Sequence, residues 1–180
     1  MKVLSTRRVF DHPWEKIDIE RVKTAQGNEF DYLVSTPNDF VIIIVFLDDE
    51  HIAMVRQYKH GMQETLLGFP AGFINDGETP EECAEREMRE EINATAQTYR
   101  VIATLSENPT RCRNKYHIVL ATDVTVIEGQ AEVIDETEGD IEFVKVHTGE
   151  LLDNEILSQI KAGPMLSAIP YILKNIRPKG

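Results

Sequence analysis

Apolar and polar residues alternate along much of the first part of the chain, with the period of a half-buried β-strand. The alternation runs through residues 14–35 and is interrupted at 24–28, where the sequence TAQGN supplies turn residues. This pattern predicts a β-hairpin or two longer strands. Residues 36–39, with the sequence TPND, then break the alternation.

A run of β-branched and apolar residues follows at 41–47, with the sequence VIIIVFL. Because this run does not alternate, it predicts a strand that is buried on both faces. The acidic turn 48–50 leads into residues 51–58, which we expect to form its partner strand. Residues 66–70 lead to a glycine-rich turn, and further strands are predicted at 99–105, 116–126 and 141–146.

The segment after the glycine-rich turn carries the start and stop signals of a helix. Thr79 is a good N-cap residue, Pro80 suits the first helical position, and Glu82 at N3 completes a capping box. Asn93 follows the last apolar position, and asparagine is among the few residues that tolerate the left-handed conformation at a helix end. The signals predict a helix that begins after Thr79 and ends before Asn93.

Carboxylates gather beside the apolar face of this helix. Glu87, Glu90 and Glu91 fall within five positions, and residues three and four apart share one helix face. We expect Arg86 and Arg89 to project from the far side. The apolar arc itself consists of Ala84, Met88 and Ile92.

Three clustered carboxylates repel one another unless a cation neutralises them. Hard oxygen ligands of this kind suit Mg²⁺ or Mn²⁺, which commonly bind phosphate oxygens. The alternative is a solvated helix face with the i,i+4 ion pairs Glu82–Arg86 and Glu85–Arg89. These pairs leave the three clustered carboxylates unexplained, so the pattern favours a metal site.

Two more helices are predicted in the last part of the chain. One covers residues 150–162 and ends at Gly163, and the other covers 164–176. Pro170 should kink the second helix or mark an irregular turn. Strands early in the chain and helices late in it predict an α+β layered fold.

Length and charge narrow the class of protein. With 180 residues the chain fits one domain, or one domain with a small appendage. A formal net charge of −12 argues against binding to nucleic acid or to an anionic membrane. Cys83 and Cys112 are too few for a disulfide framework or a zinc site. The N-terminus lacks the apolar core of a signal peptide, and the run 40–47 is too short to span a membrane. We therefore expect a cytoplasmic enzyme.

Residues 72–94 resemble the Nudix box, G-x5-E-x7-R-E-U-x-E-E-x-G-U, where U is an aliphatic residue. Asn93 replaces the second glycine, and Ala94 stands at the final aliphatic position. The resemblance implies a hydrolase that cleaves a nucleoside diphosphate linked to another moiety, with the glutamate and the arginine of the box paired to brace its turn. The residues in register are Gly72, Glu78, Arg86, Glu87, Met88, Glu90 and Glu91.

The resemblance also implies a fold and a metal site. The fold would be an α/β/α sandwich around a mixed β-sheet, with residues 1–38 as a small N-terminal β appendage and 39–180 as the hydrolase domain. The metal, Mg²⁺ or alternatively Mn²⁺, would be held by the carbonyl oxygen of Ala71 and by the three clustered carboxylates, of which Glu90 and Glu91 are also expected to be catalytic.

Features outside the box resemble the ADP-ribose pyrophosphatases. The segment RQYK at 56–59 is similar to their RQYR segment, and Arg56 either grips a diphosphate or is an ordinary strand-edge charge. Residues 70–72 match their PAG turn, whose alanine carbonyl joins the metal shell. Gly68 stands where that group usually has a glutamate. Pro109 lies 16 positions after Asn93, where ADP-ribose-specific members carry proline.

Two loops complete the expected site. Residues 108–115 include Arg111 and Arg113, which either cover a sugar or phosphate or belong to a solvated loop. The acidic loop 135–140 is placed like the one that supplies the general base in ADP-ribose pyrophosphatases. Glu136 and Glu138 are the candidates, and Glu138 is preferred because it adjoins Gly139.

Taken together, the residues and the resemblance predict Mg²⁺-dependent hydrolysis of ADP-ribose or a related nucleoside diphosphate sugar. The products would be a nucleoside monophosphate and a sugar phosphate. Alternative substrates are a GDP-sugar, a UDP-sugar or a dinucleoside polyphosphate, and a non-catalytic nucleotide-sensing module is the alternative from another class. Similar enzymes exchange an N-terminal segment between subunits, so a homodimer formed through residues 1–38 is also expected.

Overall fold

The computed structural model describes residues 1–127 and 141–176. The chain divides into two compact units, one containing residues 1–39 and 105–116 and the other containing 40–104 and the residues from 117 onward. Residues 105–116 thus group with the N-terminal strands. In the described part of the chain, no helix is long and apolar enough to cross a membrane.

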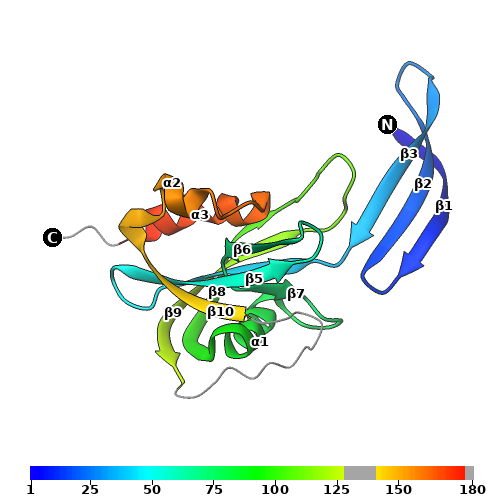
Figure 1. The fold of residues 1–180 in the computed structure, drawn as a ribbon. Helices are drawn as coiled ribbons and strands as arrows, with labels where there is room; N and C mark the ends of the chain where they lie inside the picture. Colours follow the sequence, from blue (N-terminus) through cyan, green and yellow to red (C-terminus); the bar gives the residue numbers. More distant parts are fainter. Residues whose placement is uncertain (128–140, 177–180) are drawn as a thin grey trace. The chain divides into compact units, whose positions relative to one another are not determined.

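The N-terminal unit is built on an antiparallel sheet of three strands in the order β1-β2-β3 (Figure 1). The predicted hairpin is confirmed as β2 (Glu15–Lys23) and β3 (Glu29–Pro37), and their turn includes Gly27 with a φ of 90°. Strand β1 (Lys2–His12) was not predicted. Its pairing with β2 contains two register shifts, and such irregularities remove the strict alternation that identifies a strand in sequence.

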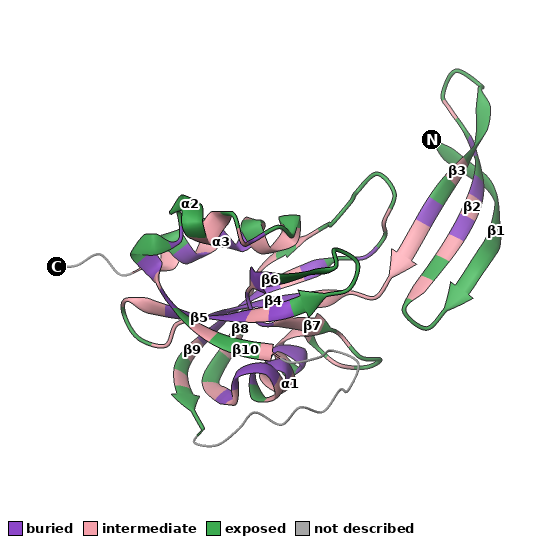
Figure 2. Ribbon diagram, viewed as in Figure 1, coloured by how far each residue is buried: buried purple, intermediate pink, exposed green. Residues whose placement is uncertain are grey.

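The two edges of this sheet differ. At β3, the Ser35 N–H donates to the Arg111 carbonyl at 2.8 Å, and the Arg113 N–H donates to the Ser35 carbonyl at 2.9 Å. Loop 105–116 therefore lies along that edge. Strand β1 forms the other edge, and all eleven of its residues are exposed (Figure 2).

One face of β2 carries two buried carboxylates. Asp18 and Glu20 are only 5% and 6% exposed. Arg8 Nε donates to Asp18 at 2.6 Å, and Arg113 Nη2 donates to Glu20 at the same distance. The hydrogen bond from Arg8 lowers the pKa of Asp18 below its ordinary value. Each buried charge in this unit is thus paired, as burial of a carboxylate requires.

The second unit contains two further sheets and the helices. A four-stranded sheet has the order β7-β4-β9-β8, and a three-stranded sheet has the order β10-β5-β6. The strands are β4 (Phe40–Val45), β5 (His51–Lys59), β6 (Glu64–Gly68), β7 (Ala71–Phe73), β8 (Ala94–Leu105), β9 (Tyr116–Val126) and β10 (Ile141–His147). The helical segments are α1 (Pro80–Ile92), a 3-10 turn (Thr148–Glu150), α2 (Asn154–Leu157) and α3 (Gly163–Asn175).

The expectation that residues 51–58 pair with 41–47 was wrong. Strand β4 is flanked by β7 and β9, so both of its edges are already occupied. Strand β5 instead pairs with β10 and β6, and a single bridge between Phe46 and Ile52 joins the turn region. Alternation and apolar runs indicate that a strand exists, but they do not indicate its neighbour.

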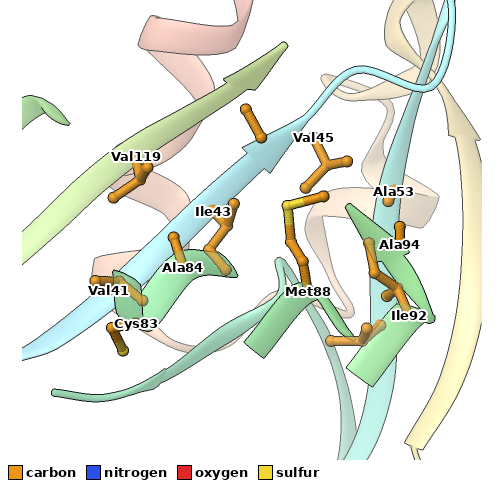
Figure 3. Close-up of a cluster of buried hydrophobic side chains, with 12 residues drawn as sticks. Val41, Ile43, Val45, Ala53, Cys83, Ala84, Met88, Ile92, Ala94 and Val119 are labelled. Carbon is orange, nitrogen blue, oxygen red and sulfur yellow. The ribbon is translucent and has the colours of Figure 1, made fainter. Parts of the chain in front are cut away.

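Strand β4 is packed between α1 and α3, which cover opposite sides of the strands of this unit (Figure 1). Val41, Ile43 and Val45 belong to one buried cluster together with Ala84 and Met88 of α1 (Figure 3). The alternate residues of β4, Ile42 and Ile44, are also fully buried. The strand is therefore apolar on both faces, as its unbroken run of apolar residues predicted.

The predicted helix over 150–162 was also wrong. The structure has the short 3-10 turn, then only the four residues of α2, and an irregular segment before α3. Asp153 is the N-cap of α2 in an extended conformation, and its carbonyl accepts the first hydrogen bonds of the helix, from the N–H groups of Ile156 and Leu157. Helix α3 begins near the predicted position and runs through Pro170.

Candidate functional site

Helix α1 begins and ends as its sequence predicts. The Thr79 hydroxyl accepts a hydrogen bond from the Glu82 N–H at 3.2 Å, and the Glu82 carboxylate accepts one from the Thr79 N–H at 2.8 Å. At the other end Asn93 is left-handed, with φ 48° and ψ 49°, and its N–H donates to the Met88 carbonyl. The capping box and the asparagine cap are confirmed, so the orientation of the carboxylate-bearing face is fixed at both ends.

The three carboxylates of α1 differ in exposure. Glu87 and Glu91 are 5% and 4% exposed, and the side chain of Glu90 is 23% exposed. One carboxylate oxygen of Glu91 accepts a hydrogen bond from the Ala71 N–H at 3.0 Å. This contact joins the helix to the first residue of β7, in the PAG turn, so the structure brings together two parts of the site that lie twenty residues apart.

Arg86 connects the box turn to the carboxylates. Its Nε donates to Glu78 at 2.9 Å, and its Nη1 lies 2.6 Å from a Glu87 oxygen and 3.1 Å from a Glu90 oxygen. Its Nη2 donates to the Phe73 carbonyl at 2.9 Å. The predicted brace between Glu78 and Arg86 is therefore present. The hydrogen bond from Arg86 lowers the pKa of Glu78, and the carboxylates raise that of Arg86.

The Arg86 side chain points in a different direction from the one that helical periodicity predicted. We expected Arg86 to project from the far side of the helix, but it turns toward the box and is partly buried. The predicted pair of Arg86 with Glu82 is replaced by these contacts, because Glu82 is engaged in the capping box. The pair of Arg89 with Glu85 is present and exposed.

Gly72 is needed where it stands because Glu87 occupies the space beside it. A Cβ added to Gly72 would lie 1.8 Å from a carboxylate oxygen of Glu87. No side chain fits at that distance, so only glycine lets the buried carboxylate lie against the turn. This is a physical reason for the first glycine of the box.

The donor set fits a hard divalent cation by its chemistry. Two buried carboxylates and a third partly exposed one stand within five positions of one helix, and Arg86 pairs with two of them, Glu87 and Glu90. Within residues 1–127 and 141–176, no three His, Cys, Asp or Glu side chains are gathered as closely as a bound ion requires. Glu87 and Glu90 are instead paired with Arg86. Glu87, Glu90 and Glu91 remain the residues that could hold a metal.

A small pocket opens beside this cluster. It has a volume of about 40 Å³, and Ala71 and Glu91 line it. Gln57 and Lys59 of β5 also line the pocket, and the Lys59 ammonium donates to the Gln57 side chain. Sequence reasoning missed both residues. The alternation of β5 could have identified them, because side chains two apart on a strand share a face.

A larger cavity of about 470 Å³ lies elsewhere in the second unit. It is lined by the β4–β5 turn, part of β9 and Asn175, and includes Asp48, Asp49 and Asp123. None of the predicted site residues in the described part of the chain lines it. The volume of a pocket therefore does not identify the active site here. The smaller pocket is the better candidate because Glu91 lines it.

The remaining predicted residues have varied positions. Arg56 turns to Glu142, with its Nη1 3.1 Å from a carboxylate oxygen, and to Gln159. Arg113 belongs to the N-terminal unit and pairs with Glu20, and the Arg111 carbonyl accepts from Ser35. Within the second unit, Arg56 is thus engaged by Glu142 of β10 and by Gln159. The predicted general bases, Glu136 and Glu138, lie outside the described residues.

Comparison with known proteins identifies the family. The NUDIX domain family matches residues 37–163. The ADP-ribose pyrophosphatase of Bacillus subtilis (strain 168) is 26% identical over 145 residues, which cover 81% of this chain and 76% of that protein. The ADP compounds hydrolase NudE of Escherichia coli (strain K12) is 31% identical over 110 residues, covering 61% of this chain and 58% of that protein.

A solved structure gives the same answer for the fold. The crystal structure of an ADP compounds hydrolase matches with a TM-score of 0.80 at 22% identity, covering 96% of this chain and 92% of that chain. The α+β sandwich predicted from the sequence is thereby confirmed. With its family match over most of its length, its box in register and this fold, the chain belongs to the NUDIX domain family, as the resemblance of residues 72–94 predicted.

Proposed function

We propose that the protein is a metal-dependent pyrophosphatase that hydrolyses ADP-ribose or a related nucleoside diphosphate sugar. Water adds to one phosphorus atom, the phosphoanhydride bond breaks, and a nucleoside monophosphate and a sugar phosphate leave. The observation that carries this proposal is the buried Glu91 carboxylate, held by the Ala71 N–H at the wall of a pocket. The names of the similar proteins, ADP-ribose pyrophosphatase and ADP compounds hydrolase, support the substrate class.

Nudix hydrolases generally use divalent metals, and we assign the site to Mg²⁺ with Mn²⁺ as the alternative. Glu87, Glu90, Glu91 and the Ala71 carbonyl would hold the ion. When bound, it would neutralise phosphate charge and lower the pKa of a bound water. Arg86 keeps the carboxylates in place by contacts to two of them.

The other roles rest on the sequence. Glu138, or alternatively Glu136, would accept the proton of the attacking water as general base. Arg56, Arg111 and Arg113 would contact the substrate, and Arg56 and Arg113 would have to exchange or share the carboxylate partner that each has in this structure. For Arg56 that partner is Glu142, whose side chain is 64% exposed, so the exchange costs little.

A panel of nucleoside diphosphate sugars tests the proposal. Each compound is incubated with the protein and Mg²⁺, and release of nucleoside monophosphate is measured, with Glu91→Gln as the matched control. We expect ADP-ribose or another ADP-sugar to give the highest kcat/KM, and chelation of the metal to abolish turnover. Preference for a nucleoside triphosphate or a dinucleoside polyphosphate would contradict the substrate class. Tight binding without any hydrolysis would instead favour a nucleotide-sensing module.

We further propose that the protein is a homodimer formed through residues 1–38. Strand β1 is an exposed edge, and unpaired edges readily pair with another chain. Large apolar side chains are exposed on this unit as well. They include Val9 at 42%, Phe10 at 48% and Trp14 at 65% exposure. A second copy of this chain would cover both the edge and these side chains.

A further inference from the structure

Asn93, which stands where the box has its second glycine, is hydrogen-bonded to the residue that follows β9. Its side-chain Nδ2 donates to the Ile127 carbonyl at 2.9 Å, and its own carbonyl accepts from the Ile127 N–H at 2.8 Å. Its N–H donates to the Met88 carbonyl within α1. Glycine adopts the same left-handed conformation readily, but it has no side chain to donate. The asparagine of this chain therefore adds a contact that the usual residue cannot make.

The last turn of α1 carries charges that oppose its own formation. Glu90 and Glu91 lie in this turn, and the C-terminal end of a helix bears a partial negative charge that repels carboxylates. Arg89, the basic residue of the turn, is paired with Glu85 one turn earlier. A charge misplaced in this way disfavours the turn by about two- to fivefold in an equilibrium constant. The turn that holds two proposed metal ligands therefore benefits from a restraint at its end.

The side-chain bond of Asn93 has the strength and the position to supply this restraint. One neutral hydrogen bond favours the folded arrangement by about two- to tenfold, which is comparable to the effect of the misplaced charges. Both of its ends are held in the sheet. Ala94, the next residue, is fully buried at the start of β8, and Ile127 directly follows β9, the strand beside β8. Fraying of the last turn would break this bond, so the bond opposes fraying.

We propose that Asn93 is a positioning residue of the metal site, and that its bond to Ile127 holds Glu90 and Glu91 where they bind a divalent cation. This inference rests on the proposed function and adds a residue that acts through the helix instead of as a ligand. Glu91 lies two residues before Asn93 and accepts from the Ala71 N–H. Displacement of the last turn would therefore move this carboxylate away from the PAG turn.

Asn93→Gly isolates the side-chain bond. Glycine keeps the left-handed conformation and both main-chain hydrogen bonds of residue 93, and it removes only the Nδ2 donor. Asn175→Gly is the matched control, because Asn175 Nδ2 donates to the Tyr171 carbonyl at 2.7 Å at the end of α3. Each variant thus loses one amide-to-carbonyl hydrogen bond at a helix end, and only one of the two helices carries the clustered carboxylates.

The readout is the Kd for Mn²⁺ without substrate, measured by the electron paramagnetic resonance signal of the free ion. We expect Asn93→Gly to raise this Kd about three- to tenfold, as the loss of one hydrogen bond predicts, with little change in melting temperature because glycine suits the left-handed position. Asn175→Gly should lower the melting temperature, since glycine weakens a helix, and leave the Kd unchanged. Loss of binding in Glu91→Gln assigns the titrated ion to this site. The Mg²⁺ concentration that gives half-maximal hydrolysis should rise with the Kd in Asn93→Gly.

Three results would overturn the inference. An unchanged Kd in folded Asn93→Gly would mean that the side-chain bond does not position the ligands. An equal rise in Asn175→Gly would mean that any loosening of the fold weakens the metal. Unchanged binding in Glu91→Gln would place the ion elsewhere. Failure of the wild-type protein to bind Mn²⁺ would reject the metal site of the proposed function itself, and that outcome is distinguishable because it precedes any variant.

Discussion

At the scale of single residues, the site is organised by one guanidinium shared among several acids. Arg86 contacts Glu78, Glu87 and Glu90, and Glu91 is held separately by the Ala71 N–H. Burial of two carboxylates is costly unless they are paired, and these contacts provide the pairing. Glu91 accepts a hydrogen bond from the Ala71 N–H, and a bound cation would neutralise its charge.

Replacing Glu91 by glutamine tests this role. The glutamine side-chain oxygen can still accept the Ala71 hydrogen bond, so the fold should persist. The loss of a ligand charge should lower kcat by two or more orders of magnitude (roughly 100-fold) at saturating Mg²⁺. Steady-state kinetics and a melting curve measure the two effects separately. Near-normal turnover in the folded variant would remove Glu91 from the metal site.

The contact between Gly72 and Glu87 gives a second prediction. Gly72→Ala places a methyl group where the Glu87 carboxylate lies, 1.8 Å from one of its oxygens. Either the turn or the carboxylate must move, and overpacking of this kind costs about 1–3 kcal/mol. Chemical denaturation should show this loss, and turnover should fall as well. Gly61→Ala, which adds a methyl group with no atom within 4 Å, is the control, and equal stability of the two variants would contradict the prediction.

The Glu78–Arg86 brace predicts a dependence of stability on pH. Arg86 lowers the folded pKa of Glu78 below its ordinary value of 4.5. The pair therefore contributes its full stability above pH 4.5, and the contribution is lost as the pH falls from 4.5 through the lowered pKa. Melting temperatures of the wild type and of Glu78→Gln should differ at pH 6 and converge in acid. A difference that grew in acid would have the wrong sign for this brace.

At the scale of elements, α1 is a local structure that its own sequence defines. Thr79→Ala removes the N-cap acceptor for the Glu82 N–H and should destabilise the protein by about 1 kcal/mol. It should leave kcat nearly unchanged, because Thr79 contacts Glu82 and none of the three clustered carboxylates in the described structure. Thermal melting and steady-state kinetics check the two parts. Lost activity with unaltered stability would instead make Thr79 a site residue.

The same element shows how far the sequence could predict the site. Helix bounds, caps and the apolar face of α1 follow from neighbours within four residues, and all of them are confirmed. Helical periodicity missed the direction of Arg86, which depends on the Phe73 carbonyl and on Glu78, whereas the resemblance to the Nudix box implied its pairing with Glu78. Helical periodicity contains no information about a turn that folds onto the same helix.

Contacts between elements were the least predictable part. The neighbour of β5 is set by which strand edges are already occupied, and residues 150–162 are helical only in α2, which begins after the extended residue Asp153. Gln57 and Lys59 line the pocket because alternate residues of β5 share a face, whereas Arg56 turns to Glu142 of β10. The sequence motif identified Arg56 by its charge, but the strand decides which side chains face Glu91.

At the scale of the whole molecule, the N-terminal unit exposes a strand edge and apolar side chains that a second copy of the chain could cover. A sheet of only three strands needs a hydrophobic face or packing against another element to be stable on its own. The two buried carboxylates of β2 are paired with Arg8 and Arg113. Residues 111–113 hydrogen-bond to the β3 edge of the sheet. The β1 edge and the apolar side chains beside it are exposed in the described structure. This surface is where a second copy should bind.

Phe10→Asp tests the dimer in the full-length chain. Phe10 is 48% exposed in this structure, so aspartate there is well tolerated by a monomer but would place a charge inside a dimer interface. Phe143→Asp, at a phenylalanine that is 44% exposed on β10, is the matched control. Light scattering at micromolar concentration should give about twice 20.5 kDa for the wild type and the control, and a mass near 20.5 kDa for Phe10→Asp. A wild-type mass near 20.5 kDa would reject the dimer, and a dimeric Phe10→Asp would place the interface away from β1.

If the partner's strands also complete the substrate pocket, the Phe10→Asp monomer should show a raised KM for ADP-ribose while its melting curve still reports a folded hydrolase unit.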